Sequence, residues 1–288
     1  MDPVRTLLFV PGHRERMIEK APGAGADGLL YDLEDSVPAT ERDTARRMLA
    51  EALATTRTLP RYIRVNGIAD AGKDETAADL NAVVLADVDG IVLPKAQSVD
   101  DIAWTAAEID KHEKTRGLES GRFEIVPMIE SALGVQFAYD ILTASARVSS
   151  VIIGSAQDGD LQTDLGADWS PEGTELLYAR SRILLAARAA GIDHPMDGVF
   201  LGLDDEAGLI RDSENARRLG YRGKTVIHPR QIDPVHNVFT PSEKELGYYR
   251  DMIAAFEDAG KNAFNFRGKM IDRAMIRKAR GLLDSFVC

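Results

Sequence analysis

Short apolar runs rich in Val, Ile and Leu alternate along this chain with longer stretches whose apolar residues recur every three or four positions. The short runs are typical of buried parallel strands, and the longer stretches are typical of amphipathic helices. The predicted strands are 7–10, 28–31, 62–65, 90–93, 124–129, 150–153, 198–201 and 225–227. The predicted helices are 15–20, 41–55, 77–85, 99–114, 133–144, 173–190, 215–219 and 243–259, followed by a terminal helix at 270–286.

Eight alternations of strand and helix predict an α/β protein, and they favour a closed (β/α)8 TIM barrel over an open doubly wound sheet. No G-x-G-x-x-G follows a predicted strand, so the dinucleotide-binding fingerprint is absent from the sequence. We expect a barrel catalytic domain over residues 1–260. Residues 261–288 would form a C-terminal helical extension that packs outside the barrel or on a neighbouring subunit.

Polar residues close most of the predicted strands. They are Asp32, Glu34 and Asp35 after the second strand, Arg64 after the third, Lys95 after the fourth, Glu130 after the fifth, Asp158 and Asp160 after the sixth, and His228 after the eighth. Parallel barrel strands direct all their carboxyl ends to one face, where active sites of this fold lie. The pattern therefore predicts one site with several carboxylates, an arginine, a lysine and a histidine.

Carboxylates with few histidines nearby suit a hard cation that prefers oxygen ligands. Mg²⁺ takes one or two carboxylates and keeps positions for water and substrate oxygens, with Mn²⁺ as an alternative. Three carboxylates within four residues, Asp32, Glu34 and Asp35, would repel one another without cationic partners. We expect them to hold Arg64 and the water molecules bound to the metal.

Charge and composition exclude several classes of protein. The formal net charge of −11 argues against nucleic acid as the main partner. There is no run of about 18 apolar residues, so no membrane span is expected. The N-terminus lacks a secretory pattern, and Cys288 is the single cysteine, so we expect a cytoplasmic protein without disulfides.

The last stretch of the chain has the opposite charge to the rest. Residues 261–288 contain seven basic and two acidic side chains in a protein whose net charge is −11. One interpretation is a solvated helical face. The other is contact with an acidic neighbouring subunit or with substrate phosphates.

Several segments resemble, in order, the HpcH/HpaI aldolase and citrate lyase β-subunit superfamily, in particular its malyl-CoA and citramalyl-CoA lyases. They are RTLLFVPG, LLYDLEDSV, YIRVNG, DGIVLPK, VPMIESALG, DLQTDLG, GKTVIHPRQI and GKMID. The resemblance covers nearly the whole chain. It implies a barrel enzyme that binds Mg²⁺ through a glutamate after the fifth strand and an aspartate after the sixth.

Glu130 in VPMIESALG matches the glutamate of this pair directly. The match for the aspartate is less direct, because GSAQDGDL carries a two-residue insertion relative to the family pattern. Counting back from Leu165 and Gly166 selects Asp160, whereas counting from Gly154 falls beside Asp158. We expect Asp160 to be the ligand and keep Asp158 as the second choice.

The resemblance also implies roles in binding and catalysis. Arg64 would grip the carboxylate of an α-oxo acid, since a guanidinium pairs with a carboxylate through two hydrogen bonds. Asp272 in GKMID would reach the active site of a neighbouring subunit and act as general acid and base. By residue type, Arg5 and Lys95 are candidates for contacting coenzyme A phosphates. We expect a homotrimer or a homohexamer.

The function implied is Mg²⁺-dependent cleavage or formation of a carbon–carbon bond in a 3-hydroxyacyl-CoA thioester such as malyl-CoA, citramalyl-CoA or citryl-CoA. The products would be acetyl-CoA or propionyl-CoA and an α-oxo acid. Three alternatives stay open: a metal-dependent aldolase acting on free oxo acids, a lyase subunit that uses an acyl-carrier-protein thioester, and a non-catalytic binding barrel.

Overall fold

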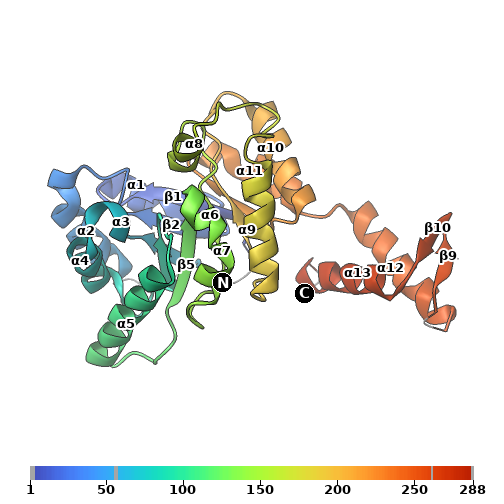
Figure 1. Cartoon of the computed structure of the whole chain (residues 1–288), viewed down its shortest axis with the longest axis horizontal. Coiled ribbons are helices and arrows are strands. Elements are labelled where there is room, and N and C mark those ends of the chain that lie inside the picture. Colours follow the sequence, from blue (N-terminus) through green and yellow to red (C-terminus); the bar gives the residue numbers. More distant parts are fainter. Residues whose placement is uncertain (1–3, 55–57, 261, 287–288) are drawn as a thin grey trace. The chain divides into compact units, whose positions relative to one another are not determined.

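Eight parallel strands form a closed barrel, which confirms the predicted fold class (Figure 1). The computed structural model describes residues 4–54, 58–260 and 262–286. The strands are β1 (Thr6–Pro11), β2 (Gly28–Asp32), β3 (Arg61–Arg64), β4 (Gly90–Leu93), β5 (Glu124–Ile129), β6 (Ile152–Ile153), β7 (Met196–Asp197) and β8 (Gly223–Val226). Each strand pairs with the next one, and β8 pairs with β1 to close the barrel.

Helices follow the strands along the chain. They are α1 (Glu15–Lys20), α2 (Arg42–Leu53), α3 (Ile68–Ala71), α4 (Lys73–Val83), α5 (Val99–Arg116), α6 (Ala132–Gln136), α7 (Ala138–Thr143), α8 (Asp160–Leu165), α9 (Leu177–Ala189), α10 (Glu206–Leu219), α11 (Ile232–Phe239), α12 (Glu243–Asp258) and α13 (Arg273–Phe286). Helix α5 begins with a capping box between Ser98 and Asp101, and it ends at Gly117 with φ 64°, a left-handed conformation that glycine adopts without steric cost. No described helix is long and apolar enough to cross a membrane.

The prediction for the seventh strand was wrong. The strand is Met196–Asp197, and the apolar run 198–201 lies beyond it. Gly198 approaches the backbone of β6 so closely that a Cβ would lie 2.4 Å from the carbonyl oxygen of Ile153. Leu201 is 44% exposed, so the run does not continue as a buried strand.

Two helix starts also differ from the predicted ones. Helix α9 begins at Leu177 and not at 173, and in the segment before it the Ser170 hydroxyl donates a hydrogen bond to Glu175. Helix α10 begins at Glu206, well before the predicted 215, and Asp205 caps it by accepting a hydrogen bond from the Gly208 N–H. The predicted helix end at Thr55 lies outside the described residues.

The core of the barrel follows the two-residue period of its strands. Val4, Leu7, Leu30, Tyr62, Val92, Val126, Met128, Ile152 and Met196 form one buried cluster. Side chains two residues apart on a strand face the same side. Asp32, Arg64 and Glu130 therefore follow Leu30, Tyr62 and Met128 on the inward face, one layer nearer the carboxyl end.

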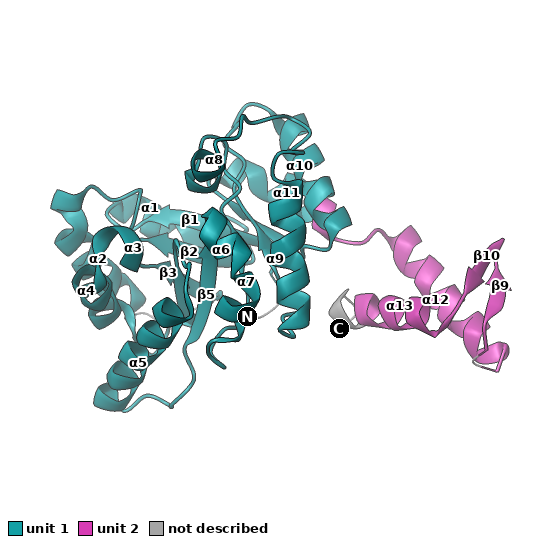
Figure 2. Cartoon of the chain, in the orientation of Figure 1, with its two compact units in different colours: residues 1–236 teal, residues 237–288 magenta. Residues whose placement is uncertain are grey.

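The chain divides into two compact units, residues 1–236 and 237–288 (Figure 2). The expected boundary lay at 260, so the C-terminal unit begins earlier and includes α12. It also contains a hairpin that the sequence pattern did not predict, made of β9 (Phe264–Phe266) and β10 (Lys269–Ile271). Because β10 occupies 269–271, the terminal helix begins at Arg273 and not at 270. Lys261 and Cys288 lie outside the described residues.

The C-terminal unit has an apolar cluster of its own. Its buried members are Met252, Phe256, Ile271, Ile276 and Ala279. Partly buried aromatic side chains of α12 and the hairpin pack against it. The unit therefore holds itself together by contacts among α12, the hairpin and α13.

A buried group of four charges ties β7 and β8 to the helices outside them. The ammonium of Lys224, on β8, donates hydrogen bonds to Asp197 at 2.6 Å and to Asp212 at 2.5 Å. Arg180 on α9 donates to the same two carboxylates. Lys224 and Asp197 are fully buried, so each charge depends on its partners for stabilisation.

Replacing Lys224 should therefore destabilise the fold. We expect Lys224→Met to lower the free energy of unfolding by about 3–5 kcal/mol, because Asp197 and Asp212 lose one of their two cationic partners. Urea unfolding followed by circular dichroism measures this. Lys111→Met, at a side chain that is 66% exposed, is the matched control and should change stability by at most about 0.5 kcal/mol. Equal stabilities of the two variants would contradict the role of the buried group.

Candidate active site

A cavity of about 450 Å³ opens at the carboxyl ends of the barrel strands. Apolar side chains, among them Phe9 and Met128, line it on the core side. Its polar lining contains Asp32, Asp35, Arg64, Glu130 and Asp160. The structure thus brings together the arginine and the carboxylates that the strand ends predicted.

Arg64 is held in place by the carboxylates at the end of β2 and just after it. Its Nε and Nη2 donate hydrogen bonds to the two oxygens of Asp32 at 2.6 and 2.8 Å. Its Nη1 lies 2.8 Å from Glu34 Oε2, and the guanidinium stacks 4.9 Å from the centre of the Phe9 ring. This planar pairing fixes the direction of the guanidinium in the cavity wall.

Burial and ion pairing act in opposite directions on the pKa values of Asp32 and Glu34. Burial alone would raise the pKa of Asp32, but the charge and hydrogen bonds of Arg64 outweigh it and hold the pKa below its usual value. Burial raises the pKa of Glu34 to about 8, and the neighbouring carboxylates Asp35 and Glu130 add to the rise. Glu34 is therefore the acid with less cationic compensation.

Glu130 lies at the end of β5, and burial raises its pKa to about 7. Its Oε1 accepts a hydrogen bond of 3.1 Å from the backbone N–H of Lys95. The chain passes close behind it at Gly154, where a Cβ would lie 2.7 Å from Glu130 Oε2. Glycine at that position leaves room for the carboxylate.

The two candidate aspartates after β6 have different surroundings. Asp160 is the first residue of α8, lines the cavity and lies 3.4 Å from the ammonium of Lys95. Asp158 is in a left-handed turn with φ 54°, and its backbone N–H donates to the side chain of Gln162. Asp158 is not among the cavity-lining residues, so the geometry favours Asp160.

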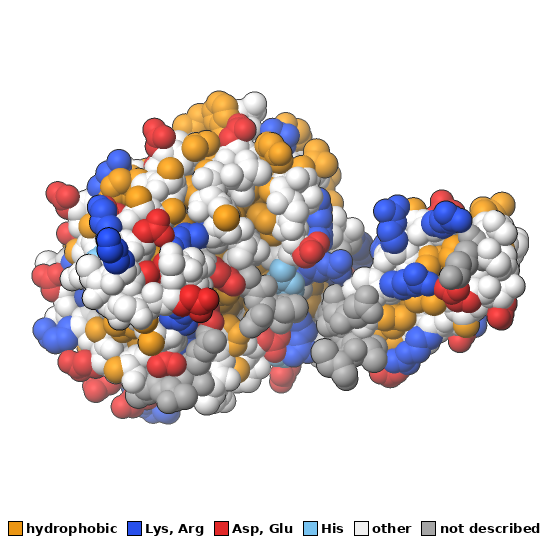
Figure 3. Space-filling view, turned by 90° about the horizontal axis from the view of Figure 1, so that it is seen from below, with side chains coloured by type: hydrophobic (Ala, Val, Ile, Leu, Met, Phe, Trp, Pro, Cys, Tyr) orange, Lys and Arg blue, Asp and Glu red, His pale blue; other side chains and the backbone are white. Residues whose placement is uncertain are grey.

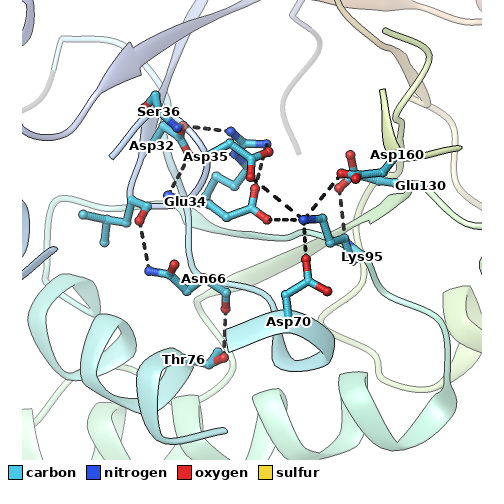
Figure 4. A network of polar contacts seen from close by, with 12 residues as sticks. Asp32, Glu34, Asp35, Ser36, Asn66, Asp70, Thr76, Lys95, Glu130 and Asp160 are labelled. Atoms are coloured by element: carbon cyan, nitrogen blue, oxygen red, sulfur yellow. Dashed lines mark hydrogen bonds and ion pairs between the residues drawn. The ribbon is translucent and has the colours of Figure 1, made fainter. Parts of the chain in front are cut away.

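The ammonium of Lys95 lies inside a ring of carboxylates (Figure 4). It is 2.5 Å from Asp70, 3.2 Å from Glu34 and 3.9 Å from Asp35, in addition to Asp160. The close-up shows the nitrogen between Glu34 on one side and Asp160 on the other. A phosphate contact by Lys95, as its residue type predicts, would require its release from these partners.

Two predicted site residues lie elsewhere in the barrel unit. Arg5 precedes β1 at the amino end of the barrel, where its guanidinium pairs with Asp27. The active-site cavity is at the carboxyl end, so the expectation that Arg5 contacts substrate is corrected. His228 caps the turn after β8 by accepting a hydrogen bond from the Arg230 N–H, and it does not line the cavity.

Asp272 is in the C-terminal unit, immediately before α13. Its Oδ1 accepts hydrogen bonds from the N–H groups of Ala274 and Met275 at 2.9 and 3.1 Å. Within this chain it therefore acts as a helix cap. Its predicted catalytic role depends on a neighbouring subunit and stays a prediction.

Sequence reasoning missed three polar residues of the site. Asp70 on α3 pairs with Lys95, but nothing in its local sequence distinguishes it from a surface acid. Ser36 and Ser155 line the cavity, and neither hydroxyl has a hydrogen-bond partner among the described residues. The only indications in the sequence were that Ser36 directly follows the acidic segment and that Ser155 comes shortly after β6.

The donor set at the mouth fits a divalent cation. Counted over the described residues, six carboxylates meet two cationic side chains there: Asp32, Glu34, Asp35, Asp70, Glu130 and Asp160, with Arg64 and Lys95. No group of three His, Cys, Asp or Glu side chains within the described ranges could hold a metal by itself. A pair of carboxylates that leaves other positions to water or substrate is how Mg²⁺ is commonly bound.

Comparison with known proteins places this barrel in a family. The model of the HpcH/HpaI aldolase/citrate lyase family matches residues 5–229. The chain belongs to this family. That confirms the resemblance found in the sequence motifs.

Three similar proteins show how far the likeness extends. Citrate lyase subunit beta of Escherichia coli strain K12 is 39% identical over 285 residues, which cover 97% of this chain and 92% of that protein. The mitochondrial citramalyl-CoA lyase of Homo sapiens is 32% identical and covers 96% of this chain and 84% of that one. The crystal structure of CitE from Mycobacterium tuberculosis, in complex with magnesium, acetoacetate and coenzyme A, superposes with a TM-score of 0.80. It is 28% identical and covers 98% and 97% of the two chains.

Proposed function

We propose that this protein is a Mg²⁺-dependent carbon–carbon lyase acting on a 3-hydroxyacyl-CoA thioester. The observation that carries the proposal is one cavity in which Glu130 and Asp160 lie beside the buried guanidinium of Arg64. Relatives named citrate lyase subunit beta and citramalyl-CoA lyase, and a similar structure that contains magnesium and coenzyme A, support it.

Different residues of the cavity would bind the metal ion, bind the oxo acid and exclude water. Glu130 and Asp160 would hold the ion, which supplies polarisation of the carbonyl oxygen of the oxo acid. Arg64 would bind the carboxylate of the oxo acid, and its pairing with Asp32 holds it ready in that direction. Apolar neighbours such as Phe9 and Met128 keep water from the reacting atoms on the core side.

Cleavage breaks the bond between carbons 2 and 3 of the acyl chain. The bonding electrons pass to the thioester as an enolate, while the hydroxyl of carbon 3 loses its proton and becomes the carbonyl of the oxo acid. The enolate carbon then takes a proton and yields the shorter acyl-CoA. We propose that Asp272 of a neighbouring subunit exchanges that proton.

Activity on a panel of thioesters tests this function. We expect cleavage of malyl-CoA, citramalyl-CoA or citryl-CoA, complete loss of activity in EDTA, and recovery on adding Mg²⁺ or Mn²⁺. The same panel presented as free hydroxy acids and as acyl-carrier-protein thioesters separates the two catalytic alternatives. Full activity in chelator, or no cleavage of any member, would contradict the proposal.

The choice between the two aspartates has its own test. Asp160→Asn should weaken Mg²⁺ binding by at least about tenfold, because a neutral amide replaces a charged ligand. Asp158→Asn removes the same charge two residues away and should leave binding close to that of the wild type. Titration calorimetry with MgCl₂ measures both, with Glu130→Gln as the reference for a lost ligand. The reverse ranking would identify Asp158 as the ligand.

The C-terminal unit supports a site shared between subunits. Lys and Arg side chains are prominent on the face of this unit that Figure 3 shows. The sequence of the hairpin and α13 contains Arg267, Lys269, Arg273, Arg277 and Arg280. The whole protein carries a net charge of −11, so a second copy offers an acidic partner for this basic surface. We propose a homotrimer or a homohexamer whose sites are completed by Asp272.

Asp272→Asn isolates the catalytic role of this residue. Asparagine caps a helix about as well as aspartate, so α13 and Mg²⁺ binding should be preserved. We expect turnover to fall by about 10²–10⁴-fold, the usual contribution of a general acid or base. Mixing Asp272→Asn chains with Arg64→Ala chains should restore part of the activity in hybrid oligomers.

Two results would contradict the shared site. One is a fully active monomer in sedimentation and activity measurements. The other is the absence of any recovery in hybrids after subunit exchange has been demonstrated.

A further inference from the structure

Lys95 contacts both carboxylates that are proposed to hold the ion. Its backbone N–H donates to Glu130 Oε1 at 3.1 Å, and its ammonium lies 3.4 Å from Asp160 Oδ2. The ammonium is also 3.2 Å from Glu34, whose side chain is only 6% exposed. A positive charge of this protein thus sits where the carboxylates of the site converge (Figure 4).

The same ammonium also reaches the rim of the cavity. It lies 2.5 Å from Asp70, whose side chain is 60% exposed and belongs to α3 outside the cavity lining. Lysine carries its charge on a flexible four-carbon stem. The ammonium can therefore leave Asp160 and Glu34 and keep its contact with Asp70 without a change in the backbone.

The backbone of Lys95 is fixed separately from its side chain. Its φ is 51°, in the left-handed region that residues other than glycine rarely adopt. Only Lys95, Asp158 and Arg267 combine a side chain with a positive φ among the described residues. Such a conformation persists when surrounding contacts hold it, and the N–H bond to Glu130 is one of them.

An ammonium and a divalent ion cannot share Asp160 without strong repulsion, because the interaction of two positive charges rises steeply at short distance. We propose that the ammonium of Lys95 is the internal counter-ion of the ion-free site. It neutralises Asp160 and Glu34 until Mg²⁺ binds, and then withdraws from both while keeping its contact with Asp70 at the rim. This inference rests on the proposed function, in which Glu130 and Asp160 hold the ion.

A purely structural role for Lys95 makes the opposite prediction. If the ammonium only gathers the carboxylates into a binding geometry, its removal would scatter them and weaken the affinity for Mg²⁺. If it competes with the ion, its removal would strengthen the affinity. The sign of the change therefore separates the two roles.

Titration calorimetry of the full-length protein with MgCl₂ alone, without substrate, measures that sign. Lys95→Met keeps the backbone N–H to Glu130 and removes only the charge, and we expect its Mg²⁺ affinity to rise on the order of tenfold. Lys73→Met is the matched control. Lys73 is exposed and stacks on Trp104, so removing its charge should leave the affinity nearly unchanged.

Asp70→Asn tests the contact that the ammonium is proposed to keep when Mg²⁺ binds. Without its rim partner the ammonium stays with Asp160 and Glu34, and we expect the Mg²⁺ affinity to fall about threefold. The same substitution in a Lys95→Met background should have little effect. Asp74→Asn, at an exposed acid in the first turn of α4, controls for the loss of one surface charge.

The outcomes separate this inference from the proposed function. If the wild-type protein binds no Mg²⁺, the proposed function fails, and the inference fails with it. If the wild type binds Mg²⁺ but Lys95→Met binds it equally or more weakly, the inference alone is overturned. Circular dichroism and thermal unfolding of each variant confirm that the comparison is made between folded proteins.

Discussion

Carboxylates outnumber cationic side chains at the mouth of this barrel, and the arrangement of the site follows from that imbalance. Each buried carboxylate needs a cation or hydrogen-bond donors, because its desolvation otherwise costs several kcal/mol. Two nitrogens of the Arg64 guanidinium donate hydrogen bonds to Asp32. Glu34 and Glu130 have less cationic compensation, and burial raises the pKa of both. A divalent cation would supply the positive charge that Glu34 and Glu130 lack in this arrangement.

The closed parallel sheet explains why these groups meet at all. Strands β2, β3 and β5 come from distant parts of the chain, yet all point their carboxyl ends to one face. The two-residue period of each strand then turns Asp32, Arg64 and Glu130 inward above an apolar core. The core therefore supports the site as a rigid floor, which suits a reaction that depends on fixed orientation of an oxo acid.

The division into two units separates two kinds of chemistry. The barrel unit holds the carboxylates, the guanidinium and the cavity, whereas the C-terminal unit carries Asp272 and a basic surface. The proposal that Asp272 of a neighbouring subunit exchanges the last proton would make that step depend on assembly. Metal and oxo-acid binding would then belong to the single barrel.

Sequence alone determined the barrel, most of its strand positions and the polar residues at the strand ends, because alternating apolar runs and parallel strand direction are local rules that repeat eight times. It did not reveal the hairpin before α13 or the true seventh strand at Met196–Asp197. Nor did it reveal that Arg5 lies at the amino end of the barrel, away from the site. The partners of Lys95 were equally hidden, since Asp70 and Asp160 are far apart in the chain. Which side chain neutralises which depends on distances across the mouth of the closed barrel, and only the tertiary structure decides those distances.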